Sequence, residues 1–150
     1  SMPELILTKR HQKLPNHAGE ICFPGGFWEN SDKSLLETAI REAEEEIGLK
    51  TEVVRYIGAL PPGATKNAVV IFPFLAEIPL PYTFSLNTTE VEKVIHLPVP
   101  TLLERGIDTV TVHIGGLQIV SPGLHFEGEL IWGATAKILL QLISEFSGVE

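Results

Sequence analysis

The chain has 150 residues, 44% of them hydrophobic, and a formal charge of −8 at pH 7. We expect one folded domain over residues 1–150, because this length can bury a core and no low-complexity tract interrupts it. The acidic balance excludes general nucleic-acid binding, and no apolar stretch is long enough to cross a membrane. Cys22 is the only cysteine, which excludes an intrachain disulfide and favours the reducing cytoplasm.

The chain begins with Ser1-Met2, which we interpret as a cloning remnant. Short strands are predicted immediately afterwards, over residues 4–10 and 20–23, with a loop between them. The second strand leads into a Gly25-Gly26 turn, and Cys22 near its end is expected to be a buried, inert thiol.

A helix is predicted from Ser34 to Gly48. Ser34 and Glu37 have the spacing of a capping box, and glycine is typical just beyond the last turn. Apolar residues at steps of four, three and four form the stripe expected to face the core: Leu36, Ile40, Ala43 and Ile47.

Three glutamates, Glu42, Glu45 and Glu46, share one face of this helix and flank the apolar stripe. Like charges at i, i+4 repel in water, but hard carboxylate oxygens are the ligands that Mg²⁺ and Mn²⁺ require. Arg41 is expected to contact Glu45 and to reach back to Asp32. The pattern therefore predicts a metal site for phosphate chemistry; a solvated acidic helix face on a scaffold domain is the alternative.

The rest of the chain predicts further strands and a closing helix, and the pattern alone gives an α+β class. The run over residues 68–77 is apolar enough to predict a central buried strand. Gly115-Gly116 predicts a two-residue hairpin turn. The other elements are expected at residues 52–60, 91–97, 109–114, 117–120 and 129–133 for strands, and at 101–105 and 134–146 for helices.

Residues 25–49 resemble the Nudix box, in which a glycine turn precedes a glutamate-rich helix. Gly26 is followed by five residues and then Asp32, and eight more residues precede the run from Arg41 to Leu49. The usual box has Glu in place of Asp32 and a spacer one residue shorter. Both departures are typical of the coenzyme A diphosphatase branch. The resemblance implies an α/β/α sandwich around a mixed β-sheet.

The segment upstream is similar to the signature of the same branch, over residues 6–10 and 14–26. Pro15 stands where the branch usually has Arg, and Glu20 where it usually has Gln. The Ile-Trp-Gly-Ala-Thr-Ala run beginning at Ile131 also resembles the branch. Since the family usually has an N-terminal segment and strand first, part of that segment is expected to be missing here.

This resemblance implies metal-dependent hydrolysis of a nucleoside diphosphate linked to another group. The branch implies coenzyme A or acyl-coenzyme A, cleaved to 3′,5′-ADP and (acyl) 4′-phosphopantetheine. Alternatives are a pyrophosphatase acting on ADP-ribose, NADH or nucleoside triphosphates, and a non-catalytic nucleotide-sensing module. The sequence does not decide between a monomer and a homodimer.

The resemblance also assigns roles. Mg²⁺ or Mn²⁺ is expected at Glu42, Glu45, Glu46 and the Gly25 carbonyl, with Asp32 orienting Arg41. The general base is expected to be Glu45 or Glu90, and the alternative for Glu90 is an exposed loop carboxylate without a catalytic role. An arginine at position 15 would bind phosphate through a bidentate fork, and proline cannot. Substitute contacts are therefore expected first from Arg10, with Lys9 as a further candidate; Lys13 and Lys66 are more typical of surface charges. His17 is expected either to bind substrate or to hold its own loop together.

Overall fold

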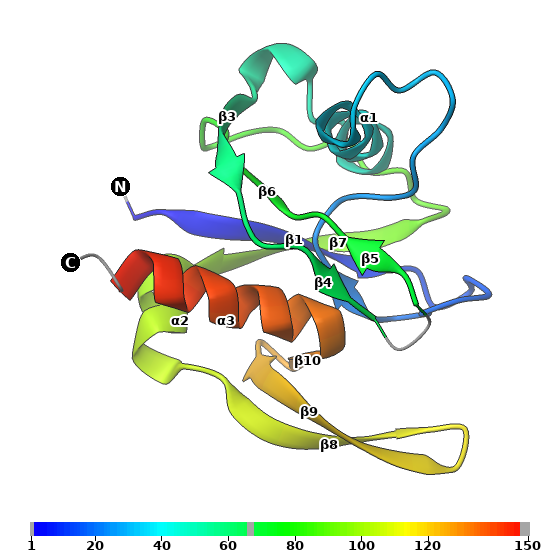
Figure 1. The fold of residues 1–150 in the computed structure, drawn as a ribbon, viewed down its shortest axis with the longest axis vertical. Coiled ribbons are helices and arrows are strands. Elements are labelled where there is room, and N and C mark those ends of the chain that lie inside the picture. The colour runs from blue at the N-terminus through cyan, green and yellow to red at the C-terminus, as the bar shows by residue number, and fades with distance from the viewer. Residues whose placement is uncertain (1, 66–67, 148–150) are drawn as a thin grey trace.

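The computed structural model describes residues 2–65 and 68–147 (Figure 1). Its central sheet has the order β2-β1-β7, formed by Ile21–Cys22, Glu4–Arg10 and Val91–Pro98, and both strand pairs are antiparallel. Thr8 lies opposite Cys22, and Leu7 lies opposite Ile95. The strands predicted at residues 4–10, 20–23 and 91–97 are therefore present.

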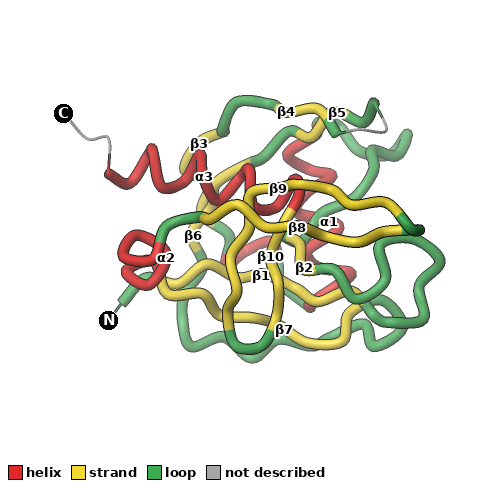
Figure 2. The backbone as a smooth tube through the Cα atoms, turned by 90° about the horizontal axis from the view of Figure 1, so that it is seen from below, coloured by secondary structure: helices red, strands yellow, loops and turns green. Residues whose placement is uncertain are grey.

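Side chains alternate between the two faces of this sheet. Leu5 and Leu7 of β1 join a core with α2 (Val99–Arg105), α3 (Gly133–Ser147), β9 (Leu117–Phe126) and β10 (Glu129–Trp132). Ile6, between them, packs into a second core with α1 (Leu35–Ile47). Figures 1 and 2 show the resulting layers, with α1 on one side of the sheet and α2 and α3 on the other.

Helix α1 begins and ends where the sequence predicts. The Ser34 hydroxyl accepts a hydrogen bond from the Glu37 amide at 3.1 Å, and Gly48 adopts the left-handed conformation at φ 70°. The Glu37 carboxylate accepts from the Lys33 amide at 2.8 Å, so the returning half of the capping box reaches one residue further back than usual.

A second three-stranded sheet has the order β10-β9-β8. The Gly115-Gly116 turn joins β8 (Asp108–Ile114) to β9 (Leu117–Phe126), as the dipeptide predicts, and β10 spans Glu129–Trp132. Strand β9 is longer than expected because it continues through Pro122, which lies opposite Thr109.

The prediction of a central buried strand over residues 68–77 is wrong. This segment forms β5 (Val70–Ile71) and β6 (Phe74–Glu77), which pair with β4 (Gly63–Ala64) and β3 (Arg55–Ala59) in separate two-stranded sheets. Pro73 separates them because proline has no N–H for a strand ladder.

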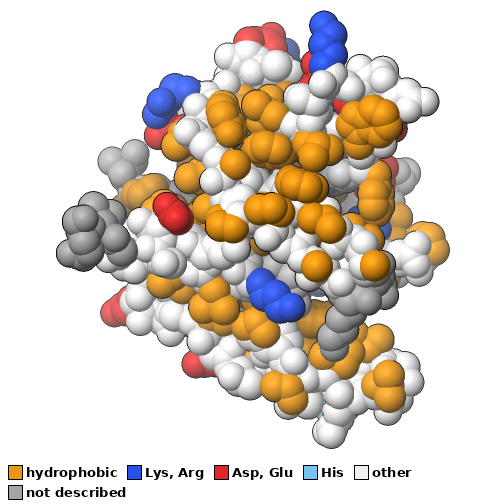
Figure 3. All heavy atoms as spheres, viewed as in Figure 1, with side chains coloured by type: hydrophobic (Ala, Val, Ile, Leu, Met, Phe, Trp, Pro, Cys, Tyr) orange, Lys and Arg blue, Asp and Glu red, His pale blue; other side chains and the backbone are white. Residues whose placement is uncertain are grey.

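These small sheets expose apolar side chains, which Figure 3 shows gathered over this region of the surface. The predicted strand over 52–60 also shortens, because Thr51–Val53 forms a short 3₁₀ helix, η1.

The α+β class is confirmed. Every strand pair recorded in the described residues is antiparallel, so the parallel pair that a mixed sheet requires is not among them. Of the helices described, none is long and apolar enough to cross a membrane.

Candidate active site

The glycine turn lies directly against the glutamate face of α1. The Gly25 amide donates to Glu46 Oε1 at 3.4 Å. A Cβ atom at Gly26 would lie 2.5 Å from the Glu42 side chain, so a larger residue there would require Glu42 or the loop to move. Glu46 is buried, Glu42 is mostly buried, and Glu45 is 55% exposed.

The crowding of carboxylates changes their protonation. Burial, together with the charges of Glu42 and Glu90, raises the pKa of Glu46 to about 8, although the hydrogen bond from the Gly25 amide opposes the shift. Burial also raises the pKa of Glu42, while its hydrogen bond from Arg41 lowers it. A bound cation would reduce the repulsion between closely spaced carboxylates in a partly buried site.

The donor set fits a divalent cation by this chemistry. The three side chains offer only hard oxygen ligands, which suit Mg²⁺ or Mn²⁺. In residues 2–65 and 68–147, no three acidic, histidine or cysteine side chains are already gathered around one point where a metal could bind. Glu45 Oε2 instead accepts from Arg41 Nη1 at 3.2 Å.

Arg41 holds the loop that precedes α1, residues 23–34, against that helix. Its guanidinium donates to both carboxylate oxygens of Asp32, at 2.9 and 3.0 Å, and to the Phe27 carbonyl at 3.1 Å. Asp32 also accepts from the Glu29 amide and the Thr38 hydroxyl. The Arg41 hydrogen bonds hold the pKa of Asp32 well below its usual range, although burial opposes this. The predicted Asp32–Arg41 and Arg41–Glu45 contacts are thus present.

The segment carrying Glu90 borders the same carboxylates. The Asn87 amide donates to the Glu46 main-chain carbonyl at 2.9 Å, and the His11 amide donates to the Glu90 carbonyl at 2.9 Å. Glu90 is exposed, and its charge raises the pKa of both Glu42 and Glu46. The structure therefore brings Glu90 to the box glutamates.

Of the three expected substrate contacts, two lie on opposite faces of β1 and the third lies in the loop that follows it. Arg10 lies on the α1 side, where its charge lowers the pKa of Glu46, and its Nε and Nη2 atoms donate to the Asn16 carbonyl at 3.3 and 2.9 Å. Lys9 turns to the opposite face and binds Glu129 Oε2 at 3.0 Å. His17 Nδ1 lies 3.1 Å from Glu20 Oε1 within the loop that joins β1 to β2, residues 11–20, which we call the signature loop. Lys66 lies outside the described residues.

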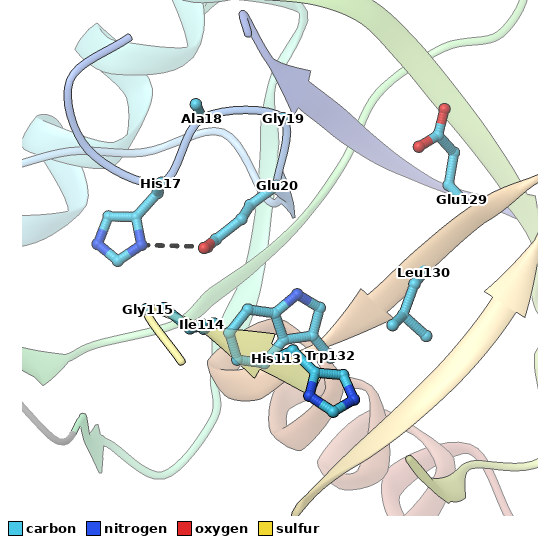
Figure 4. Close-up of a pocket in the computed structure, with 10 residues that line it drawn as sticks. All are labelled: His17, Ala18, Gly19, Glu20, His113, Ile114, Gly115, Glu129, Leu130 and Trp132. Atoms are coloured by element: carbon cyan, nitrogen blue, oxygen red, sulfur yellow. Dashed lines mark hydrogen bonds and ion pairs between the residues drawn. The ribbon is translucent and has the colours of Figure 1, made fainter. Parts of the chain in front are cut away.

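A cavity of about 590 Å³ lies between the signature loop and the turn joining β8 to β9 (Figure 4). His17 and Glu20 line it from the loop, His113 from the hairpin, and Trp132 from β10. Sequence reasoning did not assign His113 or Trp132 to a site. The tryptophan lies in the Ile-Trp-Gly-Ala-Thr-Ala run, which was the available signal, whereas nothing in the sequence pairs His113 with the distant loop.

A glycine turn set against a carboxylate-bearing helix, within α/β/α layers, defines a class of hydrolases that cleave phosphoric anhydrides with divalent cations. The NUDIX domain model matches residues 2–107. The chain belongs to the Nudix hydrolase family and is a hydrolase acting on pyrophosphate bonds of nucleotide derivatives.

Two similar relatives are Yersinia proteins, each named uncharacterized Nudix hydrolase NudL. That of Yersinia enterocolitica is 34% identical over 144 residues, covering 95% of this chain and 74% of its own. That of Yersinia pestis is 33% identical over 146 residues, covering 97% and 73%.

Two solved structures share the fold at 17% identity, and each covers 67% of this chain. The binary complex of a C. elegans Ap4A hydrolase has a TM-score of 0.55 and is covered over 73% of its own chain. The M. smegmatis Nudix hydrolase RenU has a TM-score of 0.53 and is covered over 63%.

Proposed function

We propose that this Nudix hydrolase cleaves coenzyme A or acyl-coenzyme A to 3′,5′-ADP and (acyl) 4′-phosphopantetheine. The observation that carries the proposal is the junction of the branch signature with the box. The signature segment ends at the glycine turn, where the Gly25 amide donates a hydrogen bond to Glu46. Arg10, near the start of the signature, lies close enough for its charge to lower the pKa of Glu46.

A divalent cation, Mg²⁺ or Mn²⁺, would be held by Glu42, Glu45, Glu46 and the Gly25 carbonyl oxygen. When bound, such a cation neutralises charge on the diphosphate oxygens and lowers the pKa of a water molecule. Arg41, fixed by Asp32, keeps the ligand helix and the glycine loop in one arrangement, and this positioning accounts for much of the rate in chemistry of this kind.

Glu90 accepts the proton of the attacking water, with Glu45 as the alternative base. Its support is the effect of its charge on the Glu42 and Glu46 pKa values. Arg10 contacts a substrate phosphate, and His17 contacts the substrate from the cavity wall. Lys9 acts through Glu129, which it holds at that wall, rather than by direct contact.

Pro15 favours a second candidate substrate class. An arginine there would bind a phosphate bidentately, and Arg10 already donates two hydrogen bonds to Asn16. A site with few cationic side chains suits ADP-ribose or NADH, because both lack the 3′-phosphate of coenzyme A.

The deciding experiment is turnover of coenzyme A, ADP-ribose, NADH and dATP with Mg²⁺ or Mn²⁺, with products identified by mass. Release of 3′,5′-ADP from coenzyme A, abolished by a chelator, is expected. Preferred cleavage of another diphosphate would keep the family chemistry and reject the coenzyme A assignment.

Glu45→Gln and Glu44→Gln form a matched pair for the metal ligands, because both residues are exposed on α1 and only Glu45 is a proposed ligand. The Glu45 change is expected to reduce turnover by about 100-fold or more with little loss of stability, while the Glu44 change keeps activity. Equal activity of the two variants would contradict the ligand assignment.

Residues 1–150 form one Nudix domain. The single cysteine favours a cytoplasmic location, and a homodimer is testable by measuring the mass in solution.

A further inference from the structure

The cavity of about 590 Å³ lies within the size range of small-ligand sites. One wall is the signature loop with His17 and Glu20. The facing wall comes from β8 and β10, which carry His113 and Trp132 (Figure 4). Segments distant in sequence therefore close on one space that the box residues do not line.

Aromatic rings from Trp132, His17 and His113 line the cavity. Trp132 is half-buried, and His17 and His113 are exposed. The Trp132 indole N–H has no acceptor in the part of the chain that the structure describes, so it is available to a ligand. A planar ligand can stack on such a surface, as bases stack on aromatic side chains.

Within the described part of the chain, the cavity lining offers hydrogen-bond acceptors but no cationic side chain. Its described residues include Glu20 and Glu129 and no Lys or Arg. Glu129 is paired with Lys9 at 3.0 Å and Lys93 at 2.9 Å, and Glu20 with His17 at 3.1 Å. The two lysines neutralise Glu129, so Glu20 is the carboxylate left to accept from a ligand, and the matching ligand is an uncharged group with N–H donors.

A short stretch of chain connects the cavity to the proposed metal-binding carboxylates. Glu20 lines it, and the Gly25 amide binds Glu46. The five steps of chain between positions 20 and 25 span at most about 18 Å. A nucleotide with its diphosphate at the box can therefore extend its base toward this cavity.

We propose that the cavity binds the adenine base of the substrate, stacked on Trp132 with its amino group directed to Glu20. The inference rests on the proposed adenine-containing diphosphate substrate. The Glu20 carboxylate only accepts hydrogen bonds. With the 6-position of the base facing Glu20, it accepts from the 6-amino group of adenine, whereas the 6-oxygen of inosine offers it no donor.

A binding test separates this inference from the activity. Adenosine, inosine and pantetheine are titrated into the metal-free protein while tryptophan fluorescence is recorded. Adenosine is expected to quench the fluorescence more strongly than inosine, and Trp132→Leu abolishes this quenching. Quenching by pantetheine instead of adenosine, or quenching that persists in Trp132→Leu, would overturn the proposal, whether or not coenzyme A is cleaved.

Steady-state kinetics give the second test, on whichever adenine diphosphate the enzyme hydrolyses. Trp132→Leu and His113→Ala are expected to raise KM, the tryptophan change by about tenfold or more, with kcat little altered. His113 lies on the exposed hairpin, so its variant remains informative if Trp132→Leu does not fold. Phe72→Ala removes an exposed aromatic ring outside the cavity and is expected to leave KM unchanged. Unchanged KM in the His113 variant would contradict the inference.

Discussion

The guanidinium of Arg41 and the carboxylate of Asp32 form a bidentate pair, with Nε to Oδ1 at 2.9 Å and Nη2 to Oδ2 at 3.0 Å. The Nudix box usually places Glu at this position with a spacer one residue shorter. Here a shorter carboxylate and a longer loop occur together, and the fork to Arg41 is still made. The same guanidinium reaches Glu42 and Glu45, so the loop, the arginine and the proposed ligands form one connected unit.

Replacing Asp32 by Asn is expected to reduce both stability and kcat. Asp32 is buried and accepts from Arg41, Thr38 and the Glu29 amide, and an amide keeps the shape but removes the charge and one acceptor. We expect thermal unfolding several degrees lower and a clear fall in kcat.

Glu29→Gln is the matched control, because Glu29 is exposed and 3.6 Å from the same arginine. Exposed ion pairs contribute little to stability, so its unfolding temperature is expected to stay unchanged. A wild-type kcat in the Asp32 variant would contradict the positioning role.

Replacing Gly26 by Ala is expected to weaken divalent-cation binding. The new Cβ would lie 2.5 Å from the Glu42 carboxyl carbon, so either this side chain or the loop must move. Calorimetry with Mn²⁺ measures the change, expected as about a tenfold or greater loss of affinity. Gly58→Ala is the control, since a Cβ there meets nothing within 4 Å. Equal affinities of the two variants would show that Gly26 does not support Glu42.

Local signals predicted the helix and its contacts well. The Ser34 cap, the Gly48 ending and the spacing of the glutamates all depend on neighbours within one helix. The Arg41–Asp32 pair was also predictable, because nine residues of loop and helix turn bring the two side chains together.

Features that depend on distant segments were not predicted. The apolar run over residues 68–77 indicated burial, yet Val70 and Phe72 are about half exposed, because periodicity cannot show which strand covers which. Likewise, the cavity joins His17 to His113 across the fold, and only the tertiary structure places them together.

Replacing Glu90 by Gln is expected to lower kcat by about 100-fold while KM stays near its wild-type value. The amide cannot accept the proton of the attacking water, and the main-chain hydrogen bond from His11 to Glu90 holds the segment in place. Glu92→Gln is the control, because it changes an exposed carboxylate on β7 that lies 3.7 Å from Lys9. Unchanged kcat in Glu90→Gln would contradict this role and indicate that Glu45 is the general base.

The stability of the metal-free protein is expected to fall as the pH rises from about 4.5 to about 8. Burial raises the folded-state pKa of Glu46 to about 8 from an ordinary value of 4.5, so the folded state holds a proton that the unfolded state releases. This contribution is fully present below pH 4.5 and is lost as the pH passes through 8, at up to about tenfold in the folding constant per pH unit.

Urea unfolding with a chelator at several pH values measures this slope. Glu46→Gln keeps an acceptor for the Gly25 amide but cannot titrate, so its slope is expected to be shallower than that of the wild type. Glu44→Gln, an exposed neighbour on the same helix, is expected to keep the wild-type slope. Identical slopes in all three proteins would mean that Glu46 ionises normally, and the site would then lack the crowded anionic character from which cation binding is inferred.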